Sequence, residues 1–301
     1  MRITKVIVAT AATLSLALTA CGGETTPGTT GSNGGDPAGA GQTISLGVVG
    51  ASQDQWTIFQ TKAEVAGIDV EIKDFTDYTT PNPAVSDGSL TANQFQHILY
   101  LAQYNLDTDS DLVPIASTAI YPLALYSEEY TNLDEIPEGA EIAIPNDETN
   151  KSRAIHVLAE AGLLVLQEGT GVIAGEEDIN SELSRVSVAP MDAQQTVTAL
   201  PSIAGAVVNN DFVNDAGLDP ETALFADDPD AESAEPYINV LVVRPADADN
   251  AQLLELGRVL HDPEVVAALE KDSADSAVIV DKTPQELQEI LAEVTESLQQ
   301  D

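Results

Sequence analysis

The sequence predicts an α/β protein with largely parallel sheets. Apolar segments of strand length alternate with segments of helical periodicity along the chain after residue 43. The apolar segments are rich in Val and Ile and show little polar alternation, which is typical of sheets covered on both faces. The expected strands lie at residues 43–50, 69–75, 111–127, 141–145, 185–191, 203–210 and 238–244.

Helical segments fill the intervals between these strands. A helix is expected over residues 54–65, residues 93–104 are a further candidate, and another helix follows residue 145 and stops at Gly162. Shorter helices are expected within 192–202 and 211–218. The carboxyl-terminal part is helical as well, because Asp262-Pro263 suits a helix start and TPQE (283–286) matches a capping box.

The charge of the chain is strongly negative. Lys and Arg number 11 against 50 Asp and Glu, which gives a formal net charge of −39. This balance argues against nucleic-acid binding and against docking on anionic lipid. We interpret it as a solvated acidic surface, and no segment after the amino-terminal region is long and apolar enough to predict a membrane span.

The amino-terminal region predicts export and lipidation. Arg2 and Lys5 precede an apolar run over 6–20, which has the length of a secretory signal and ends in LTAC (18–21). This tetrapeptide resembles the lipobox of bacterial lipoproteins, and Cys21, the only cysteine, would carry the lipid. An ordinary cleaved signal followed by a chance cysteine is the alternative. We therefore expect a lipoprotein signal peptide at 1–20 and a protein held on the extracytoplasmic side of the cell membrane by lipid alone.

Residues 21–43 follow as the lipidated cysteine and a tether of Gly, Thr, Ser and Pro, which cannot bury enough apolar surface to fold. The remaining part of the chain is long enough for one large domain or two modest ones.

Signatures of catalysis and metal binding are absent from the sequence. The three histidines, His97, His156 and His261, are far apart, and no HExxH, CxxC, GxSxG or phosphate-binding loop motif occurs. The carboxylate clusters GEED (175–178) and DDPD (227–230) lack calcium-loop spacing and are expected to be solvated acidic loops. We therefore expect no enzyme, no metal and no cofactor.

Residues 144–158, IPNDETNKSRAIHVL, place Lys151 and Arg153 where a helix is expected to begin. A cation is disfavoured near a helix amino terminus unless a negative group accompanies it. Asp147 or Glu148 could supply that charge, and a ligand carboxylate is the alternative, which open amides near Asn150 would also favour.

A second set of binding groups lies at residues 77–83 and 93–101, where Tyr and His combine an apolar body with a polar tip. Simple core packing is the other explanation for these aromatic residues.

Several motifs in this order resemble the NlpA/MetQ lipoproteins, the methionine-binding components of ABC importers. The motifs are FxDYxxPN (75–82), NxFQHxxYL (93–101), YPLALYS (121–127), IPNDxTNxxRA (144–154), AGL (161–163), VNN (208–210) and PYINVLVVR (236–244). The resemblance implies a two-lobed periplasmic-binding-protein fold, type II-like, with two crossing hinge strands. It places lobe 1 at 44–122 plus 237–301 and lobe 2 at 123–236.

The resemblance also implies a ligand site. Arg153 would bind the carboxylate of an amino acid, and Asn150 would shape the same loop. Asn209 and Asn239 would hold the α-amino and α-carboxylate groups. The wall around a thioether side chain would consist of Tyr78, Phe95, His97 and Tyr100.

This chain departs from the family pattern near the aromatic wall. It has Ile98-Leu99 where the family has Lys-Pro, Thr91-Ala92-Asn93 where it has Asp-Ala-Asn, and Phe212 where it has Tyr. None of these positions belongs to the implied carboxylate site.

The resulting expectation is a lipoprotein that captures an amino acid by lobe closure and delivers it to the permease and ATPase of an ABC importer. Methionine is the expected ligand. Another apolar amino acid or a dipeptide remains an alternative ligand. A surface adhesin or sensor that contacts a protein remains an alternative function.

Overall fold

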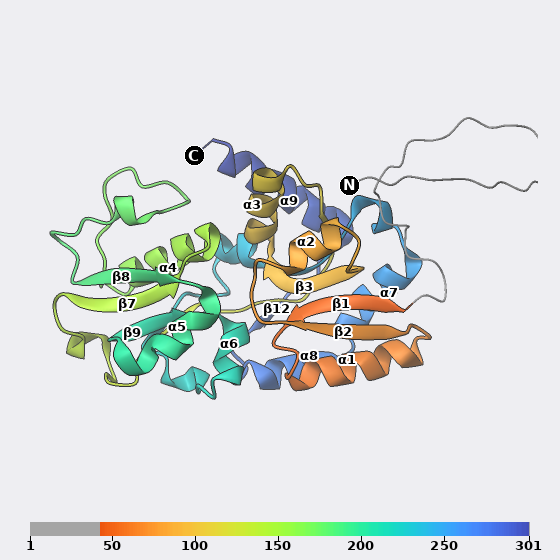
Figure 1. The fold of residues 1–301 in the computed structure, drawn as a ribbon, viewed down its shortest axis with the longest axis horizontal. Coiled ribbons are helices and arrows are strands. Elements are labelled where there is room, and N and C mark those ends of the chain that lie inside the picture. Colours follow the sequence, from red (N-terminus) through yellow and green to blue (C-terminus); the bar gives the residue numbers. More distant parts are fainter. Residues whose placement is uncertain (1–42, 301) are drawn as a thin grey trace, which may run out of the picture. The chain divides into compact units, whose positions relative to one another are not determined.

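The computed structural model describes residues 43–300, with the backbone alone for Asp215. All described residues belong to one compact unit of the chain. The predicted signal peptide, Cys21 and the tether lie outside the described residues. Figure 1 shows two α/β lobes, each built around its own five-stranded sheet.

The sheet of lobe 1 has the strand order β2-β1-β3-β11-β4. Its strands are β1 (Ile44–Val49), β2 (Val70–Phe75), β3 (Ala92–His97), β4 (Val113–Ser117) and β11 (Asn239–Val243). Strand β1 pairs in parallel with β2 and β3, whereas β11 is antiparallel to both β3 and β4. The prediction of largely parallel sheets is therefore wrong for this half of the sheet, because β11 returns from the other lobe in the opposite direction.

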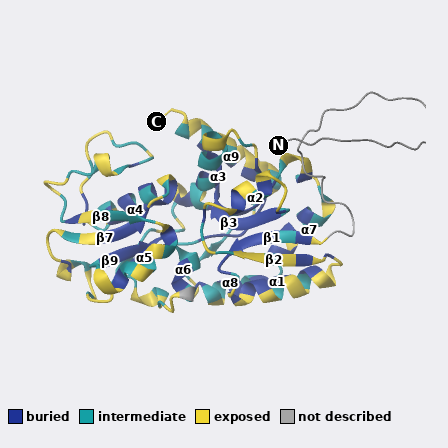
Figure 2. Cartoon of the chain, in the orientation of Figure 1, coloured by how far each residue is buried: buried dark blue, intermediate teal, exposed yellow. Residues whose placement is uncertain are grey.

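Helices cover both faces of this sheet (Figure 1). They are α1 (Asp54–Val65), α2 (Pro81–Ser86), α3 (Ile98–Thr108), α7 (Ala251–Leu260), α8 (Pro263–Asp272) and α9 (Pro284–Leu298). Helices α1, α7 and α8 pack on one face around Leu46 and Phe59, and α2, α3 and α9 pack on the other around Val240 and Ile98. Burial on both faces explains why the inner strands lack an exposed polar face. Figure 2 shows β1 and β3 as largely buried, whereas the edge strand β2 is mostly exposed or intermediate.

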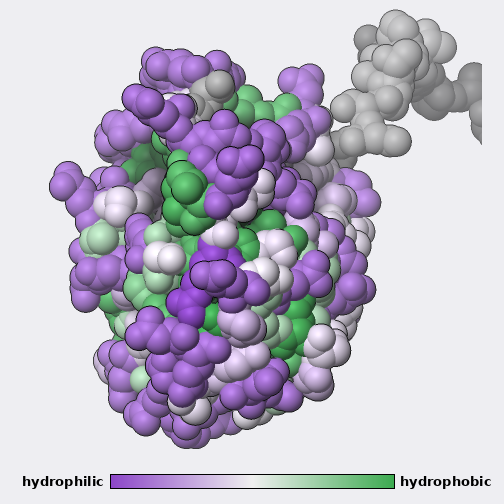
Figure 3. Space-filling model, turned by 90° about the vertical axis from the view of Figure 1, so that its left-hand side faces the viewer, coloured by the Kyte–Doolittle hydropathy of each residue, from purple (hydrophilic) through white to green (hydrophobic). Residues whose placement is uncertain are grey.

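The sheet of lobe 2 has the strand order β10-β6-β9-β7-β8. Its strands are β6 (Ala124–Tyr126), β7 (Ala140–Pro145), β8 (Val186–Met191), β9 (Gly205–Val208) and β10 (Phe225–Ala226). Strand β7 is parallel to β8 and β9, while β6 is antiparallel to β9 and β10. The helices of this lobe are α4 (Glu148–Glu160), α5 (Ala193–Ala199) and α6 (Asn210–Asp215). Figure 3 shows one face of the molecule, largely covered by hydrophilic side chains.

Shorter elements complete the chain. A two-stranded sheet pairs β5 (Ala119–Ile120) with β12 (Val278–Ile279). The 3₁₀ helices are η1 (Leu133–Glu135), η2 (Glu176–Asp178), η3 (Leu200–Ser202), η4 (Pro220–Thr222), η5 (Glu232–Tyr237) and η6 (Pro245–Asp247).

Two segments cross between the sheets. The first crossing segment (118–123) runs from β4 to β6, and the second crossing segment (227–238) runs from β10 to β11. The predicted two-lobed class with two crossing connections is thus confirmed. For the boundaries of the lobes we propose the predicted ranges: residues 44–122 and 237–301 form lobe 1, and residues 123–236 form lobe 2.

The candidate helix over 93–104 is wrong in its first part. Residues 92–97 form β3, and all six are buried in the middle of the sheet. Helix α3 begins only at Ile98. The preceding residue, His97, is its N-cap and accepts a hydrogen bond from the Tyr100 N–H. The polar residues of β3 are tolerated because amides satisfy one another: Asn82 Nδ2 donates to Gln96 Oε1 at 2.7 Å, and Asn93 Nδ2 donates to Asn82 Oδ1 at 2.8 Å.

Candidate functional site

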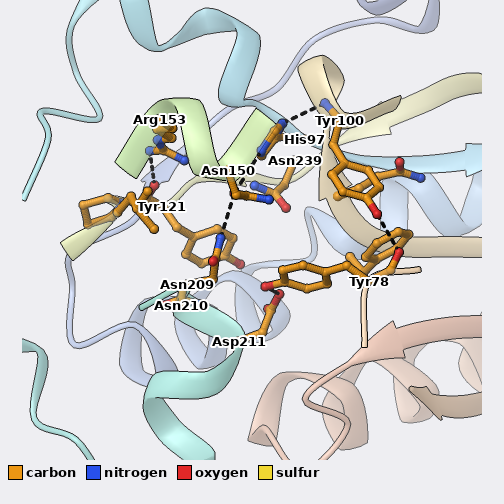
Figure 4. Close-up of a pocket in the computed structure, with 14 residues that line it drawn as sticks. Tyr78, His97, Tyr100, Tyr121, Asn150, Arg153, Asn209, Asn210, Asp211 and Asn239 are labelled. Carbon is orange, nitrogen blue, oxygen red and sulfur yellow. Dashed lines mark hydrogen bonds between the residues drawn. The ribbon is translucent and has the colours of Figure 1, made fainter. Parts of the chain in front are cut away.

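A cavity lies where the two lobes face each other, and we call it the interlobe cavity. All eight predicted site residues line it (Figure 4): Tyr78, Phe95, His97, Tyr100, Asn150, Arg153, Asn209 and Asn239. The other lining residues were not predicted: Gln96, Tyr121, Pro122, Leu123, Asn210 and Asp211. Its interior leaves about 40 Å³ for the centres of water molecules, so the walls lie close together. Segments far apart in sequence thus converge on one small, mixed polar and aromatic site.

Arg153 reaches this cavity from the second turn of α4, not from the first. The helix begins at Glu148 and has Asp147 as its N-cap, so Arg153 lies beyond the residues most affected by the helix dipole. The arginine is nevertheless only 5 % exposed. The cost of burying this charge therefore explains its need for a partner better than the dipole does.

The partner of Arg153 in this structure is Asp227, and neither Asp147 nor Glu148. Nε donates to Asp227 Oδ2 at 2.7 Å, and Nη2 donates to Oδ1 at 3.1 Å. Nη2 also donates to the carbonyl of Tyr121 at 2.8 Å, and the guanidinium carbon lies 4.0 Å from the centre of the Tyr237 ring. Within residues 43–300, Nη1 makes no hydrogen bond, so its donors remain available.

The expectation of a solvated loop at 227–230 is therefore wrong for Asp227. Its side chain is only 18 % exposed and is fixed by Arg153. Seventy-four positions separate the two residues in the chain, so no local pattern could have indicated the pair.

Asn150 is the polar junction between the lobes. Its backbone N–H, expected to be open to an anion, donates to Asp147 Oδ1 at 3.0 Å, so that expectation is wrong. Its side-chain oxygen instead accepts from Asn209 Nδ2 at 2.8 Å and lies 3.4 Å from His97 Nε2. Burial raises the pKa of Asp147, and the hydrogen bonds from Asn150 partly offset this effect.

His97 is held neutral and in one tautomer. Nδ1 accepts the Tyr100 N–H at 3.0 Å, so the proton belongs on Nε2, which faces Asn150. Burial, and then the charge of Arg153, lower the pKa of His97 to about 3. Among residues 43–300, no cluster of three or more His, Cys, Asp or Glu side chains is arranged to hold a metal ion.

The aromatic side chains form a connected wall. The ring centres of Tyr78 and Phe95 lie 5.8 Å apart, and Phe95 lies equally far from Tyr100. Phe212 packs against Tyr78, and the centres of the two rings lie 5.2 Å apart. The Tyr100 hydroxyl donates to the Tyr78 carbonyl at 2.8 Å, and burial raises the pKa of Tyr100. The rings therefore support one another and offer ring surface to an apolar group.

Polar atoms also line the cavity. Asn209 Oδ1 is buried and has no hydrogen-bond partner within the described residues, so it is an acceptor suited to an N–H donor of a ligand. Asn239 Nδ2 makes one long hydrogen bond, 3.4 Å, to the Tyr237 carbonyl. Among the described residues, Asp211 is the only carboxylate in the lining, and it accepts a hydrogen bond from the Tyr78 hydroxyl at 2.8 Å.

One guanidinium, amide acceptors and an aromatic wall in a cavity between lobes are suited to holding a small charged molecule that has an apolar part. Two α/β lobes joined by two crossing segments define the class: a periplasmic-binding-protein fold of the kind that serves as a solute receptor.

The particular family follows from comparison. The model of the family described as "NlpA lipoprotein" matches residues 44–280, and the chain belongs to this family. The D-methionine-binding lipoprotein MetQ of Salmonella typhimurium is 35 % identical over 233 residues, which cover 76 % of this chain and 84 % of that protein.

Two solved structures are similar in fold and sequence. The substrate-binding protein of a methionine transporter from Streptococcus pneumoniae has a TM-score of 0.73 and 33 % identity, covering 79 % of this chain and 95 % of that one. A nutrient-binding protein from Burkholderia cenocepacia, solved bound to methionine, has a TM-score of 0.73 and 31 % identity, covering 78 % and 99 %.

The family also bears on localisation. Its members carry the name lipoprotein, in agreement with the predicted lipid-anchored protein on the extracytoplasmic side. Among residues 43–300, no helix is both long and apolar enough to cross a membrane.

Proposed function

We propose that this chain binds methionine in the interlobe cavity and delivers it to an ABC importer. The observation that carries the proposal is the buried Arg153, which lines a cavity walled by aromatic rings and whose Nη1 makes no hydrogen bond among the described residues. Relatives named for methionine binding support the choice of ligand.

Each group of an amino acid has a suitable counterpart in the cavity. Arg153 receives the carboxylate, because a guanidinium donates strong charge-assisted hydrogen bonds to carboxylate oxygens. Asn209 and Asn239 hold the α-amino and α-carboxylate groups, with the unpaired Asn209 Oδ1 as acceptor for the ammonium. Asn150 orients Asn209 and His97 through its side-chain oxygen.

The ligand side chain lies against the aromatic wall. Tyr78, Phe95, His97 and Tyr100 surround it, and a thioether gains of order 1 kcal/mol or less from each sulfur–aromatic contact. A neutral His97 suits this role, because a charged imidazolium would repel Arg153 and disfavour an apolar side chain.

Transport follows from lobe closure. Contacts from both lobes are complete only in the closed state, so ligand binding shifts the population toward that state. The permease and ATPase of the importer then recognise the closed protein, which the lipid on Cys21 keeps at the membrane. The protein performs no chemistry on its ligand.

A thermal-shift and calorimetry screen tests this function. Purified protein is mixed with L-methionine, D-methionine, leucine and a methionine dipeptide. At a hundred times Kd, a ligand adds about 2.7 kcal/mol of stability, equivalent to about 5–10 °C in Tm for a domain of this size. We expect this shift with methionine, recovered unaltered afterwards. A shift only with leucine or the dipeptide would change the ligand, and no shift with any small solute would favour an adhesin or sensor.

A further inference from the structure

Arg153 is connected to both crossing segments at once. It donates to the Tyr121 carbonyl of the first crossing segment and to Asp227, the first residue of the second crossing segment. It also stacks on Tyr237, near the end of the second crossing segment. The side chain that faces the ligand cavity is thus fixed by the parts of the chain that link the lobes.

The carboxylate of Asp227 accepts three hydrogen bonds. Oδ2 accepts from Arg153 Nε at 2.7 Å, and Oδ1 accepts from Arg153 Nη2 at 3.1 Å and from the Leu123 N–H at 2.8 Å. The carboxylate thereby joins the first crossing segment, the second crossing segment and α4. These bonds occupy one edge of the guanidinium and leave Nη1 on the opposite side.

Asp227 does not line the interlobe cavity. It lies instead in the wall of a second cavity, of about 310 Å³, together with Arg153, His156, Glu160 and Tyr237. Arg153 belongs to the walls of both cavities, whereas Asp227 belongs to the wall of the second alone. Asp227 would therefore affect the geometry of a ligand in the interlobe cavity through Arg153 and not by direct contact.

We propose that Asp227 is a positioning residue that presents Nη1 of Arg153 to the ligand carboxylate. This inference rests on the proposed function. An arginine side chain loses considerable rotamer entropy when it is fixed, and a group already held in its binding geometry avoids that loss when the ligand arrives. The carboxylate of Asp227, anchored on Leu123, provides this pre-organisation.

The sign of the effect separates positioning from simple charge. If Asp227 acted only as a nearby negative charge, it would weaken carboxylate binding, and its neutralisation would strengthen the binding of methionine. If Asp227 positions the guanidinium, its neutralisation weakens the binding of methionine, although the site becomes more positive. The two explanations predict changes of opposite direction.

The experiment compares Asp227→Asn with Asp230→Asn. The control removes the same charge from an exposed residue of the same segment. Calorimetry gives Kd for L-methionine and for L-methioninamide, which lacks the carboxylate. For Asp227→Asn we expect at least about tenfold weaker methionine binding and a smaller ratio of the two affinities. Asp230→Asn should retain both values of the unmodified protein.

Tighter or unchanged methionine binding by Asp227→Asn would overturn the inference, and so would an unchanged ratio between methionine and its amide. If Asp227→Asn does not fold, Asp227→Glu is used instead. It keeps the charge, but its side chain is longer by one methylene and so displaces the guanidinium. The same fall in the ratio of methionine affinity to methioninamide affinity is expected. Failure of the proposed function is distinguishable, because then the unmodified protein itself does not bind methionine.

Discussion

The hydroxyl of Tyr78 in lobe 1 donates a 2.8 Å hydrogen bond to Oδ2 of Asp211 in lobe 2. Tyr78 is 8 % exposed, so this contact between lobes is shielded from water. A second contact joins α6, the helix that contains Asp211, to lobe 1, since Asn214 Nδ2 donates to the Asp272 carbonyl at 2.6 Å. The arrangement of the lobes in this structure is therefore stabilised by hydrogen bonds of the protein itself.

We predict that Asp211→Asn opens the lobes more readily. A hydrogen bond to a charged group contributes about 1.5–3 kcal/mol, and part of this is lost when the acceptor becomes neutral. Stopped-flow measurements should give methionine dissociation about tenfold faster, and small-angle scattering should give a larger radius of gyration without ligand. Glu221→Gln, an exposed substitution in lobe 2, is the control. Dissociation at the normal rate would show that this contact does not stabilise closure.

The second prediction concerns Arg153→Ala. This substitution removes the group that is proposed to bind the ligand carboxylate. Because Arg153 is paired with Asp227, it also leaves a largely buried carboxylate uncompensated. We expect loss of methionine binding together with about 3 kcal/mol of lost stability in urea unfolding.

The double variant Arg153→Ala/Asp227→Ala is the control for this cause. It should be less destabilised than the single variant, because no unpaired carboxylate remains. Near-normal methionine affinity in Arg153→Ala would refute the role of the arginine, and equal stability of the unmodified protein and the single variant would refute the energetic account.

The third prediction concerns pH. Burial lowers the folded-state pKa of His97 to about 3, from an ordinary value of 6.5. The unfolded state therefore binds a proton between these values while the folded state does not. His97 contributes its full stabilisation above pH 6.5, and stability falls by about 1.4 kcal/mol per pH unit as the pH decreases toward 3.

His97→Asn should reduce this slope, since Asn can still cap α3 but does not titrate. Urea unfolding between pH 7 and 4 measures the difference, with His156→Gln as a control outside the interlobe cavity. Parallel stability curves for His97→Asn and the unmodified protein would contradict a neutral, buried His97.

The fourth prediction concerns the membrane anchor. Cys21→Ala removes the only thiol that could be lipidated. We expect the precursor to remain unprocessed by lipoprotein signal peptidase and the mature lipid-anchored form to disappear from the membrane fraction, which immunoblotting and fatty-acid labelling would detect. Ser32→Ala, in the predicted tether, should change neither. Normal processing and labelling of Cys21→Ala would refute the anchor.

Local signals in the sequence identified most elements of the fold. The bounds of α1 agree with the prediction, and Thr283 and Glu286 form the predicted capping box of α9. Periodicity failed at β3, because its polar side chains are satisfied by Asn82, a residue outside the strand, and so do not mark an exposed face. The antiparallel β11 also has no local signal, since its direction depends on the path of the chain through lobe 2.

The site was predicted through family motifs more than through local chemistry. Arg153 and Asn209, which the motifs indicate, both line the interlobe cavity. Asp227 and Asp211 were missed because their importance arises from partners 74 and 133 positions away, which only the folded chain brings together.

The most direct test of the account is a crystal structure of the protein with bound methionine. We predict the ligand between the lobes, its carboxylate within about 2.7–2.9 Å of Arg153 Nη1 and its thioether against Tyr78 and Phe95. A methionine whose carboxylate lies away from Arg153, or a guanidinium directed outward into solvent, would contradict it.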